Sequence, residues 1–207
     1  MKIAISPRLY LDKLTSELRM SLDTRWIYIL NKIGYEVYIL PLNNSSEKIS
    51  FSKFDGLILS GGGDISSINN NAENSLRDSY ETHLIEFCID NKLPILGVCR
   101  GAQLINDFFG GSLRKFDNHV NQNHDLKYTK SYPKNYLKPK WANCYHNFSI
   151  LKDDLSEKLE IYATSQDGSI EAFGNKTLKL LCIMWHPERP SSDEQNNLGM
   201  IEHFFNK

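Results

Sequence analysis

The sequence has few cysteines, and they are not arranged as in a metal site or a disulfide-rich scaffold. Cys88, Cys99, Cys144 and Cys182 stand singly in 207 residues. Zinc sites that can be recognised in a sequence usually contain cysteines two to four residues apart, and small secreted domains carry cysteines at high density. We therefore expect reduced thiols, and no disulfide framework.

Long apolar runs and an excess of one charge are also missing. No stretch approaches the ~20 apolar residues of a membrane span, and the apolar run after Met1 is too short for a signal peptide. Lys and Arg total 24 against 25 Asp and Glu, so a formal net charge of −1 gives no general attraction to nucleic acid or an anionic membrane. We expect a cytoplasmic protein with neither partner, although a local basic patch at 127–140 stays open.

Strand-like and helix-like apolar patterns alternate through the first half of the chain. Short apolar runs indicate strands at 2–6, 36–40, 56–59, 95–98 and 178–185. The alternation predicts an α/β fold with a mostly parallel central sheet and helices on both faces, and short strands after residue 148 give a smaller antiparallel extension. Because no linker or repeat divides the chain, we expect residues 1–207 to form one domain.

Three unusual turns each follow an apolar strand at its C-terminal end. They are the glycine-rich loop at 60–64, the turn around Cys99, and His186-Pro187-Glu188. Ligands of parallel α/β folds bind at that edge of the sheet, so the predicted fold brings the three turns together. Their convergence is the main reason to expect a reactive site there.

The turn around Cys99 has the pattern of a nucleophile elbow. Gly97 and Gly101 flank the cysteine between an apolar strand and a helical pattern. A helix N-terminus favours a thiolate over a thiol. A lone cysteine before a helix is more often a small buried residue, but the two glycines favour the nucleophile.

His186 and Glu188 are the candidate base and its orienting carboxylate. Histidine can take and return a proton near neutral pH, and residues two apart in an extended chain lie on the same side. Backbone N–H groups of glycines 61–63 and of Arg100 would stabilise an oxyanion, so acyl transfer through a thioester is implied. Taken alone, His-Pro-Glu could equally be a surface turn. The glycines could form a phosphate-binding turn, but the Lys and Ser/Thr of a P-loop are missing.

The segment 116–141 has little periodicity and is expected to be a functional or mobile loop. It carries His119 and His124, which are poor metal ligands without a third partner, so we expect both to be solvated. No metal or cofactor is predicted. Cys88, Cys144 and Cys182 are expected to pack in the interior. Whether the segment closes over the site is left open.

Taken together, the three turns resemble the class I glutamine amidotransferase superfamily. The Gly-Gly-Gly-Asp form at 61–64, the arginine after Cys99 and the sequence at 166–172 resemble its γ-glutamyl-γ-aminobutyrate hydrolase branch. The resemblance covers nearly the whole chain. It implies a flavodoxin-like three-layer fold and hydrolysis of a γ-glutamyl amide, without a cofactor.

The resemblance also implies roles for individual residues. Cys99 would form a γ-glutamyl thioester, His186 would shuttle the proton, and Glu188 would orient His186. The oxyanion donors would be the backbone N–H groups of Gly62 and Arg100. The substrate pocket would be formed by Gly61, Gly63, Asp64, Gln103, Tyr145 and His146. Cys144 stands where the family usually has serine, which puts that pocket contact in question.

Three functions stay open at this point. The first is a free-standing hydrolase of a γ-glutamyl amide, with a cytidine diphosphate-linked amide of capsule biosynthesis or a polyamine-pathway intermediate as substrate. The second is a glutaminase component that supplies ammonia to a separate synthetase, and the third is a noncatalytic ligand-binding relative. A phosphate-bearing substrate would need cationic contacts from Arg8, Arg19, Arg25 or the lysines of 127–140. The oligomeric state, including a homodimer, is also open.

Overall fold

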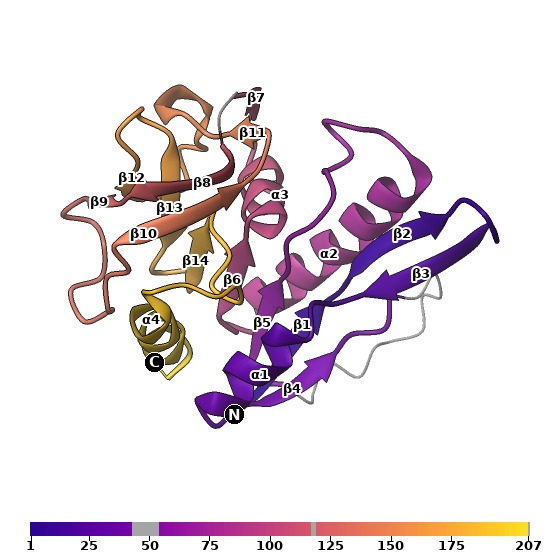
Figure 1. Cartoon of the computed structure of the whole chain (residues 1–207), viewed down its shortest axis with the longest axis horizontal. Helices are drawn as coiled ribbons and strands as arrows, with labels where there is room; N and C mark the ends of the chain where they lie inside the picture. The colour runs from indigo at the N-terminus through magenta and orange to yellow at the C-terminus, as the bar shows by residue number, and fades with distance from the viewer. Residues whose placement is uncertain (43–53, 117–118, 207) are drawn as a thin grey trace.

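The computed structural model describes residues 1–42, 54–116 and 119–206, and a central eight-stranded sheet dominates it (Figure 1). In spatial order the strands are β4 (Glu36–Ile39), β1 (Lys2–Ser6), β5 (Gly56–Leu59), β6 (Ile95–Val98), β14 (Leu180–Ile183), β13 (Ile170–Asn175), β12 (Glu160–Thr164) and β9 (Lys127–Tyr128). The strands from β4 to β14 are parallel, and the remaining pairs are antiparallel. The predicted mostly parallel central sheet is therefore confirmed.

Helices cover both faces of the sheet. α1 (Arg25–Lys32) and α4 (Glu194–Phe205) pack on one face, and α2 (Ala72–Asp90) and α3 (Arg100–Phe108) pack on the other. Successive strand side chains point to opposite faces, so Ile58 contributes to the first core while Leu57 and Leu59 contribute to the second. This alternation produces the three layers.

Three small antiparallel sheets lie outside the main sheet. They pair β2 (Arg8–Asp12) with β3 (Glu17–Ser21), β7 (Arg114–Lys115) with β11 (Phe148–Ser149), and β8 (Val120–Asp125) with β10 (Trp141–Tyr145). A short 3₁₀ helix occupies Lys152–Asp154. The expectation of a patternless loop at 116–141 is wrong for β8 and β9, because both pair with strands distant in the sequence.

The C-terminal ends of three neighbouring parallel strands carry the three unusual turns. β5 pairs with β6, and β6 pairs with β14, each in parallel. The glycine-rich loop, Cys99 and His186 follow these strands in turn, so adjacent strands deliver them to one edge of the sheet. Within the described part of the chain, no helix is long and apolar enough to cross a membrane.

Candidate active site

Cys99 lies on a strained turn between β6 and α3. Its φ of 51° and ψ of −105° are rare for a residue with a Cβ, and its N–H donates to the carbonyl oxygen of Ile183 at 2.8 Å. Because α3 begins at the next residue, the thiol lies at a helix N-terminus, where free N–H groups favour negative charge. The residue is 6% exposed. The turn therefore holds the thiol at the strand end, largely shielded from solvent.

Two glycines allow the chain to pack tightly around Cys99. A Cβ at Gly101 would lie 2.2 Å from the carbonyl oxygen of Leu59, and a Cβ at Gly97 would lie 3.0 Å from the backbone nitrogen of Ala102. A Cβ at the first distance would clash with the backbone, and a Cβ at the second distance would make an unusually close contact with it. Glycine at both positions lets β5, β6 and α3 meet at the turn.

His186 and Glu188 form a hydrogen-bonded pair beside this turn. His186 Nδ1 lies 2.7 Å from Glu188 Oε1, and both residues are buried. Burial lowers the pKa of His186, but the negative charge and hydrogen bond of Cys99, followed by those of Glu188, give a net rise to about 9. Since Glu188 occupies Nδ1, Nε2 is left for Cys99. The surroundings thus favour the protonated imidazolium form of His186.

Residues of β10 hold His186 in place. The Asn143 side chain accepts from the His186 N–H at 2.7 Å and donates to its carbonyl oxygen at 2.9 Å. The Tyr145 ring meets the imidazole edge-on with ring centroids 6.1 Å apart, and the Arg189 guanidinium lies 3.8 Å from the centroid of the Tyr145 ring. The imidazole is therefore fixed through both its backbone and its ring.

The glycine-rich loop after β5 lies directly against Cys99 and His186. A Cβ at Gly61 would lie 2.7 Å from His186 Cε1 and 3.4 Å from Cys99 Cβ. Gly62 and Gly63 have φ of 90° and 82°, in the left-handed region that glycine adopts readily. The absence of side chains therefore brings loop backbone to the thiol and the imidazole.

Arg77 of α2 sets the orientation of this loop. It donates to the carbonyl oxygens of Ser60 and Gly62 at 2.7 Å each and to that of Gly61 at 3.5 Å. In a trans peptide the C=O and the next N–H point in opposite directions. Because the Gly61 carbonyl faces Arg77, the N–H of Gly62 points away from Arg77.

Buried charges connect Arg77 to the Cys99 turn. Arg77 Nε donates to Glu81 Oε1 at 2.8 Å, and the Arg100 guanidinium donates to both Glu81 and Asp78. The side chains of Arg100 and Glu81 are fully buried. Burial and then the charge of Arg100 lower the pKa of Arg77 to about 10, against the opposing effect of Glu81, so Arg77 stays charged at neutral pH. One ionic network therefore supports both the loop and the turn.

A cavity of about 180 Å³ borders His186 and Glu188. It is lined by Arg8, Ser21, Leu22, Asp23, Trp26, Ser60, Gly61, Gly62, His186, Glu188 and Arg189. Arg8 and Arg189 bring positive charge to its wall. Arg25 is bound to Asp23 through hydrogen bonds of 2.9 and 3.1 Å, whereas Arg19 pairs with Asp12 and Glu17 on the β2–β3 hairpin.

The residues predicted for the substrate pocket do not all gather at this cavity. Gly61 lines it, and Tyr145 contacts His186 from the side of β10. Gln103 is buried and donates its amide to the carbonyl oxygen of Phe148 at 2.9 Å, while Asp64 accepts from Asn69 at 3.3 Å. Gly63 has only two atoms within 4 Å of an added Cβ, from Arg8 and Asn74.

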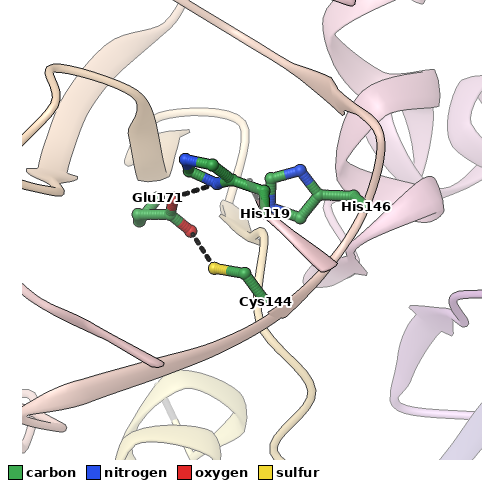
Figure 2. A group of neighbouring side chains, drawn as sticks. All are labelled: His119, Cys144, His146 and Glu171. Carbon is green, nitrogen blue, oxygen red and sulfur yellow. Dashed lines mark hydrogen bonds and ion pairs between the residues drawn. The ribbon is translucent and has the colours of Figure 1, made fainter. Parts of the chain in front are cut away.

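His146 belongs instead to a second group of side chains, with His119, Cys144 and Glu171, which we call the His119 cluster (Figure 2). All four residues are buried. The expectation of a solvated His119 is therefore wrong, because contacts with β10 and β13 cover it. His124 stacks on His119 with ring centroids 4.3 Å apart and is partly exposed. Cys144, Cys88 and Cys182 are buried as expected.

The resemblance places the segment 143–146 along the pocket, but the sequence did not reveal the bonds of Asn143 to His186 or the buried charges of α2. The buried face of α2 includes Arg77, Asp78 and Glu81 as well as Leu84 and Cys88. These charged residues continue the helical spacing of the apolar ones, which is the signal that could have revealed them. Nothing in the sequence near Asn143 indicates its contacts with His186, which is 43 residues away.

Comparisons with known proteins identify the family and the fold of the chain. The sequence profile of the family Peptidase C26 matches residues 11–188. The chain is 35% identical to the gamma-glutamyl-CDP-amidate hydrolase of Campylobacter jejuni over 99% of this chain and 98% of that protein. It is 30% identical to a glutamine-hydrolyzing GMP synthase component of Methanocaldococcus jannaschii over 82% and 84%. A glutamine amidotransferase from Thermotoga maritima has the same fold, with a TM-score of 0.69, 16% identity and coverage of 99% and 82%.

Proposed function

The chain belongs to the peptidase C26 family, whose members include glutamine amidotransferase-like hydrolases, and we propose that it cleaves a γ-glutamyl amide through a thioester on Cys99. One observation carries the proposal. The strained Cys99 turn lies beside a His186 imidazole whose Nδ1 is 2.7 Å from a carboxylate of Glu188. This is the arrangement that activates a thiol as an acyl acceptor.

In the first half of the reaction, the Cys99 thiolate attacks the γ-carbonyl carbon. The resulting oxyanion accepts hydrogen bonds from the N–H groups of Gly62 and Arg100. Arg100 is the first residue of α3, so its N–H has no carbonyl partner within the helix. His186 gives its proton to the leaving nitrogen, the C–N bond breaks, and the thioester forms.

In the second half, His186 takes a proton from a water molecule that attacks the thioester. The C–S bond breaks, glutamate leaves, and Cys99 returns to the thiolate with His186 protonated. Glu188 holds the imidazole in the required orientation and stabilises its positive charge throughout.

We propose that the leaving nitrogen carries an anionic, nucleotide-linked group. Arg8 and Arg189 line the cavity beside His186, and Arg25 lies close to it. Guanidinium groups bind phosphate oxygens through paired hydrogen bonds. The similarity to a gamma-glutamyl-CDP-amidate hydrolase supports the same leaving group, and with it a function in capsule biosynthesis.

Glutamate release from a panel of substrates tests this proposal. The panel contains a CDP-linked γ-glutamyl amide, γ-glutamyl-γ-aminobutyrate and glutamine. We expect the nucleotide-linked amide to have the highest kcat/KM. Arg8→Met should raise its KM by about 10-fold or more through loss of a charge-assisted hydrogen bond, with little effect on glutamine. Arg19→Met is the matched control, because Arg19 already pairs on the hairpin.

Two results would contradict parts of the proposal. Equal effects of Arg8→Met and Arg19→Met on the KM of the nucleotide-linked amide would contradict the proposal of an anionic leaving group. Glutamine hydrolysis that starts only when a synthetase is added would favour a second candidate function, the supply of ammonia to that synthetase, which the similarity to a glutamine-hydrolyzing GMP synthase supports. No glutamate release from any substrate would overturn the hydrolase itself.

A further inference from the structure

The His119 cluster lies where a small sheet meets the main sheet. His119 directly precedes β8, Cys144 lies on β10, His146 follows β10, and Glu171 lies on β13. One donor atom from each of the four lies within 4.8 Å of all the others. Two imidazoles, a thiol and a carboxylate thus converge from strands that are distant in the sequence.

The spacing of these atoms is close to that of a tetrahedral metal site. Zinc bonds of about 2.0–2.3 Å to nitrogen, oxygen and sulfur place neighbouring ligand atoms about 3.3–3.8 Å apart. Cys144 Sγ lies 3.4 Å from one oxygen of Glu171, Oε2, and His119 Nδ1 lies 3.6 Å from the other oxygen, Oε1, so each carboxylate oxygen already lies at ligand spacing from one neighbour (Figure 2). Shifts of about 1 Å in the remaining side chains would complete the tetrahedron.

Two imidazole nitrogens of the His119 cluster are available to bind a ligand. His119 Nδ1 and His146 Nε2 are buried and have no hydrogen-bond partner among the residues that the structure describes. His119 is 0% exposed and His146 is 5% exposed. A buried polar atom without a partner costs about 1–3 kcal/mol, so two in one cluster indicate a missing ligand.

A second layer of hydrogen bonds prepares His119 and Glu171 for a cation. His119 Nε2 lies 2.7 Å from Asp167 Oδ2, which leaves Nδ1 as the free donor atom. Metal-binding histidines usually give their other N–H to a carboxylate in this way. Ser169 donates to Glu171 Oε1 at 2.9 Å and, through its backbone, to Asp167 Oδ1 at 3.0 Å.

We propose that His119, Cys144, His146 and Glu171 bind a divalent transition-metal ion of the zinc class. Nitrogen and sulfur donors exclude the oxygen-preferring Ca²⁺ and Mg²⁺, and a mixed set of imidazole, thiolate and carboxylate suits Zn²⁺. On binding, the Cys144 thiol loses its proton to solvent and forms an S–Zn bond, with no change of oxidation state. Four protein ligands make the site a structural one.

The metal would stabilise the wall that holds His186. β10 carries Cys144 between Asn143, which brackets the His186 backbone, and Tyr145, whose ring meets the imidazole. A metal bond from Cys144 to an ion shared with Glu171 would tie β10 to β13 of the main sheet. The function of the ion is therefore to fix β10, and the proposed hydrolysis does not pass through it.

Metal binding is measured directly, in the full chain carrying Cys99→Ala. This background removes the other thiol and imidazole pair that could bind zinc. We expect one Zn²⁺ per chain in a titration of the metal-free protein with Zn²⁺ alone. With Co²⁺, we expect the intense thiolate-to-metal absorption and the visible bands of a tetrahedral site.

Variants then assign the ligands. Adding Cys144→Ser should abolish the thiolate-to-cobalt absorption, and adding His119→Asn should weaken Zn²⁺ binding by about 100-fold or more. Asp167→Asn should weaken binding by about 10–100-fold as a positioning residue. Cys88→Ala, which removes a buried thiol on α2, is the matched control and should leave binding unchanged.

The proposal is wrong if the Cys99→Ala protein binds no stoichiometric Zn²⁺, or if its Co²⁺ complex lacks thiolate absorption. It is equally wrong if Cys144→Ser and Cys88→Ala bind the metal alike. If Cys144→Ser does not fold, the Co²⁺ spectrum of the Cys99→Ala protein alone decides. All these readouts are independent of substrate, so they stand whether or not the proposed hydrolysis is correct.

Discussion

Two buried groups of this molecule contain a cysteine, a histidine and a glutamate, and they differ in backbone geometry and in electrostatics. In the first group, Cys99 lies on a strained turn at a helix N-terminus, and Glu188 binds the histidine. In the His119 cluster, Cys144 lies within a strand and faces Glu171 itself at 3.4 Å. The same residue types are therefore arranged for different chemistry.

Electrostatics separate the two groups further. Burial, followed by the charge of Glu171, raises the pKa of Cys144, so its thiol keeps its proton. Burial also lowers the pKa of His146 to about 3, so that imidazole is neutral, whereas the pKa of His186 is raised to about 9. A neutral imidazole beside a carboxylate suits a cation as ligand, while an imidazolium beside a cysteine suits acyl transfer. Composition alone does not define a catalytic site.

Replacing each cysteine is the strongest test of this comparison. Cys99→Ala should lower kcat/KM by about 10⁴-fold or more, because the members of a catalytic unit fail together. Cys144→Ala should lower it by less than about tenfold, through a looser β10. Glutamate release from the preferred substrate measures both. Cys88→Ala serves as the control, and a larger loss for Cys144→Ala than for Cys99→Ala would reverse the assignment of the two groups.

The two groups also differ in what supports them. The Cys99 turn rests on buried ion pairs of Arg77 and Arg100, so Arg100→Met would leave Asp78 without its arginine partner and Glu81 with Arg77 alone. The free energy of unfolding should fall by about 3–5 kcal/mol, because a buried charge loses its counter-ion. Urea denaturation measures the fall. Arg114→Met is the matched control, since Arg114 is 49% exposed in its pair with Asp154 and should cost at most about 1 kcal/mol. Equal losses would show that the buried network is not a support.

The sequence predicted those parts of the molecule that depend on short apolar runs. Runs of four buried residues define β5, β6 and β14, and the rule for parallel sheets then places the turns after them at one edge. The placement of the three turns at one edge of the sheet can therefore be predicted without knowledge of any long-range contact. The distances among Cys99, His186 and Glu188 cannot be predicted in this way, because they depend on how Asn143 and the loop at 60–64 pack.

Features without an apolar pattern could not be predicted. β8 has the polar sequence 120–125, which lacks the alternation of a half-buried strand. In β3, Leu18 and Met20 do alternate with polar residues, yet all five residues are exposed, so the alternation does not mark a buried face. Charged residues usually indicate a solvated face, and only the helical spacing of the α2 charges with its buried apolar residues indicates otherwise. They are buried because opposite charges meet across α2 and α3. His119 contacts the nearby Phe116 and His124, but Cys144, His146 and Glu171, which are 25 to 52 positions away, also surround it, and no local pattern indicates those contacts.

Glu188 and Glu171 should differ in their effect on the pH dependence of kcat/KM. His186 must be protonated to donate to the leaving nitrogen, so kcat/KM should fall as the pH rises through its pKa of about 9. Glu188 contributes to the raised pKa, and Glu188→Gln should therefore move this alkaline limb to lower pH and reduce kcat/KM by about 10²-fold. Glu171→Gln should leave the limb in place, because Glu171 faces Cys144 and His119. The pH dependence of kcat/KM for the three proteins measures the shift. A limb that moves equally in both variants would show that general electrostatics, rather than the His186–Glu188 hydrogen bond, sets the pKa of the base.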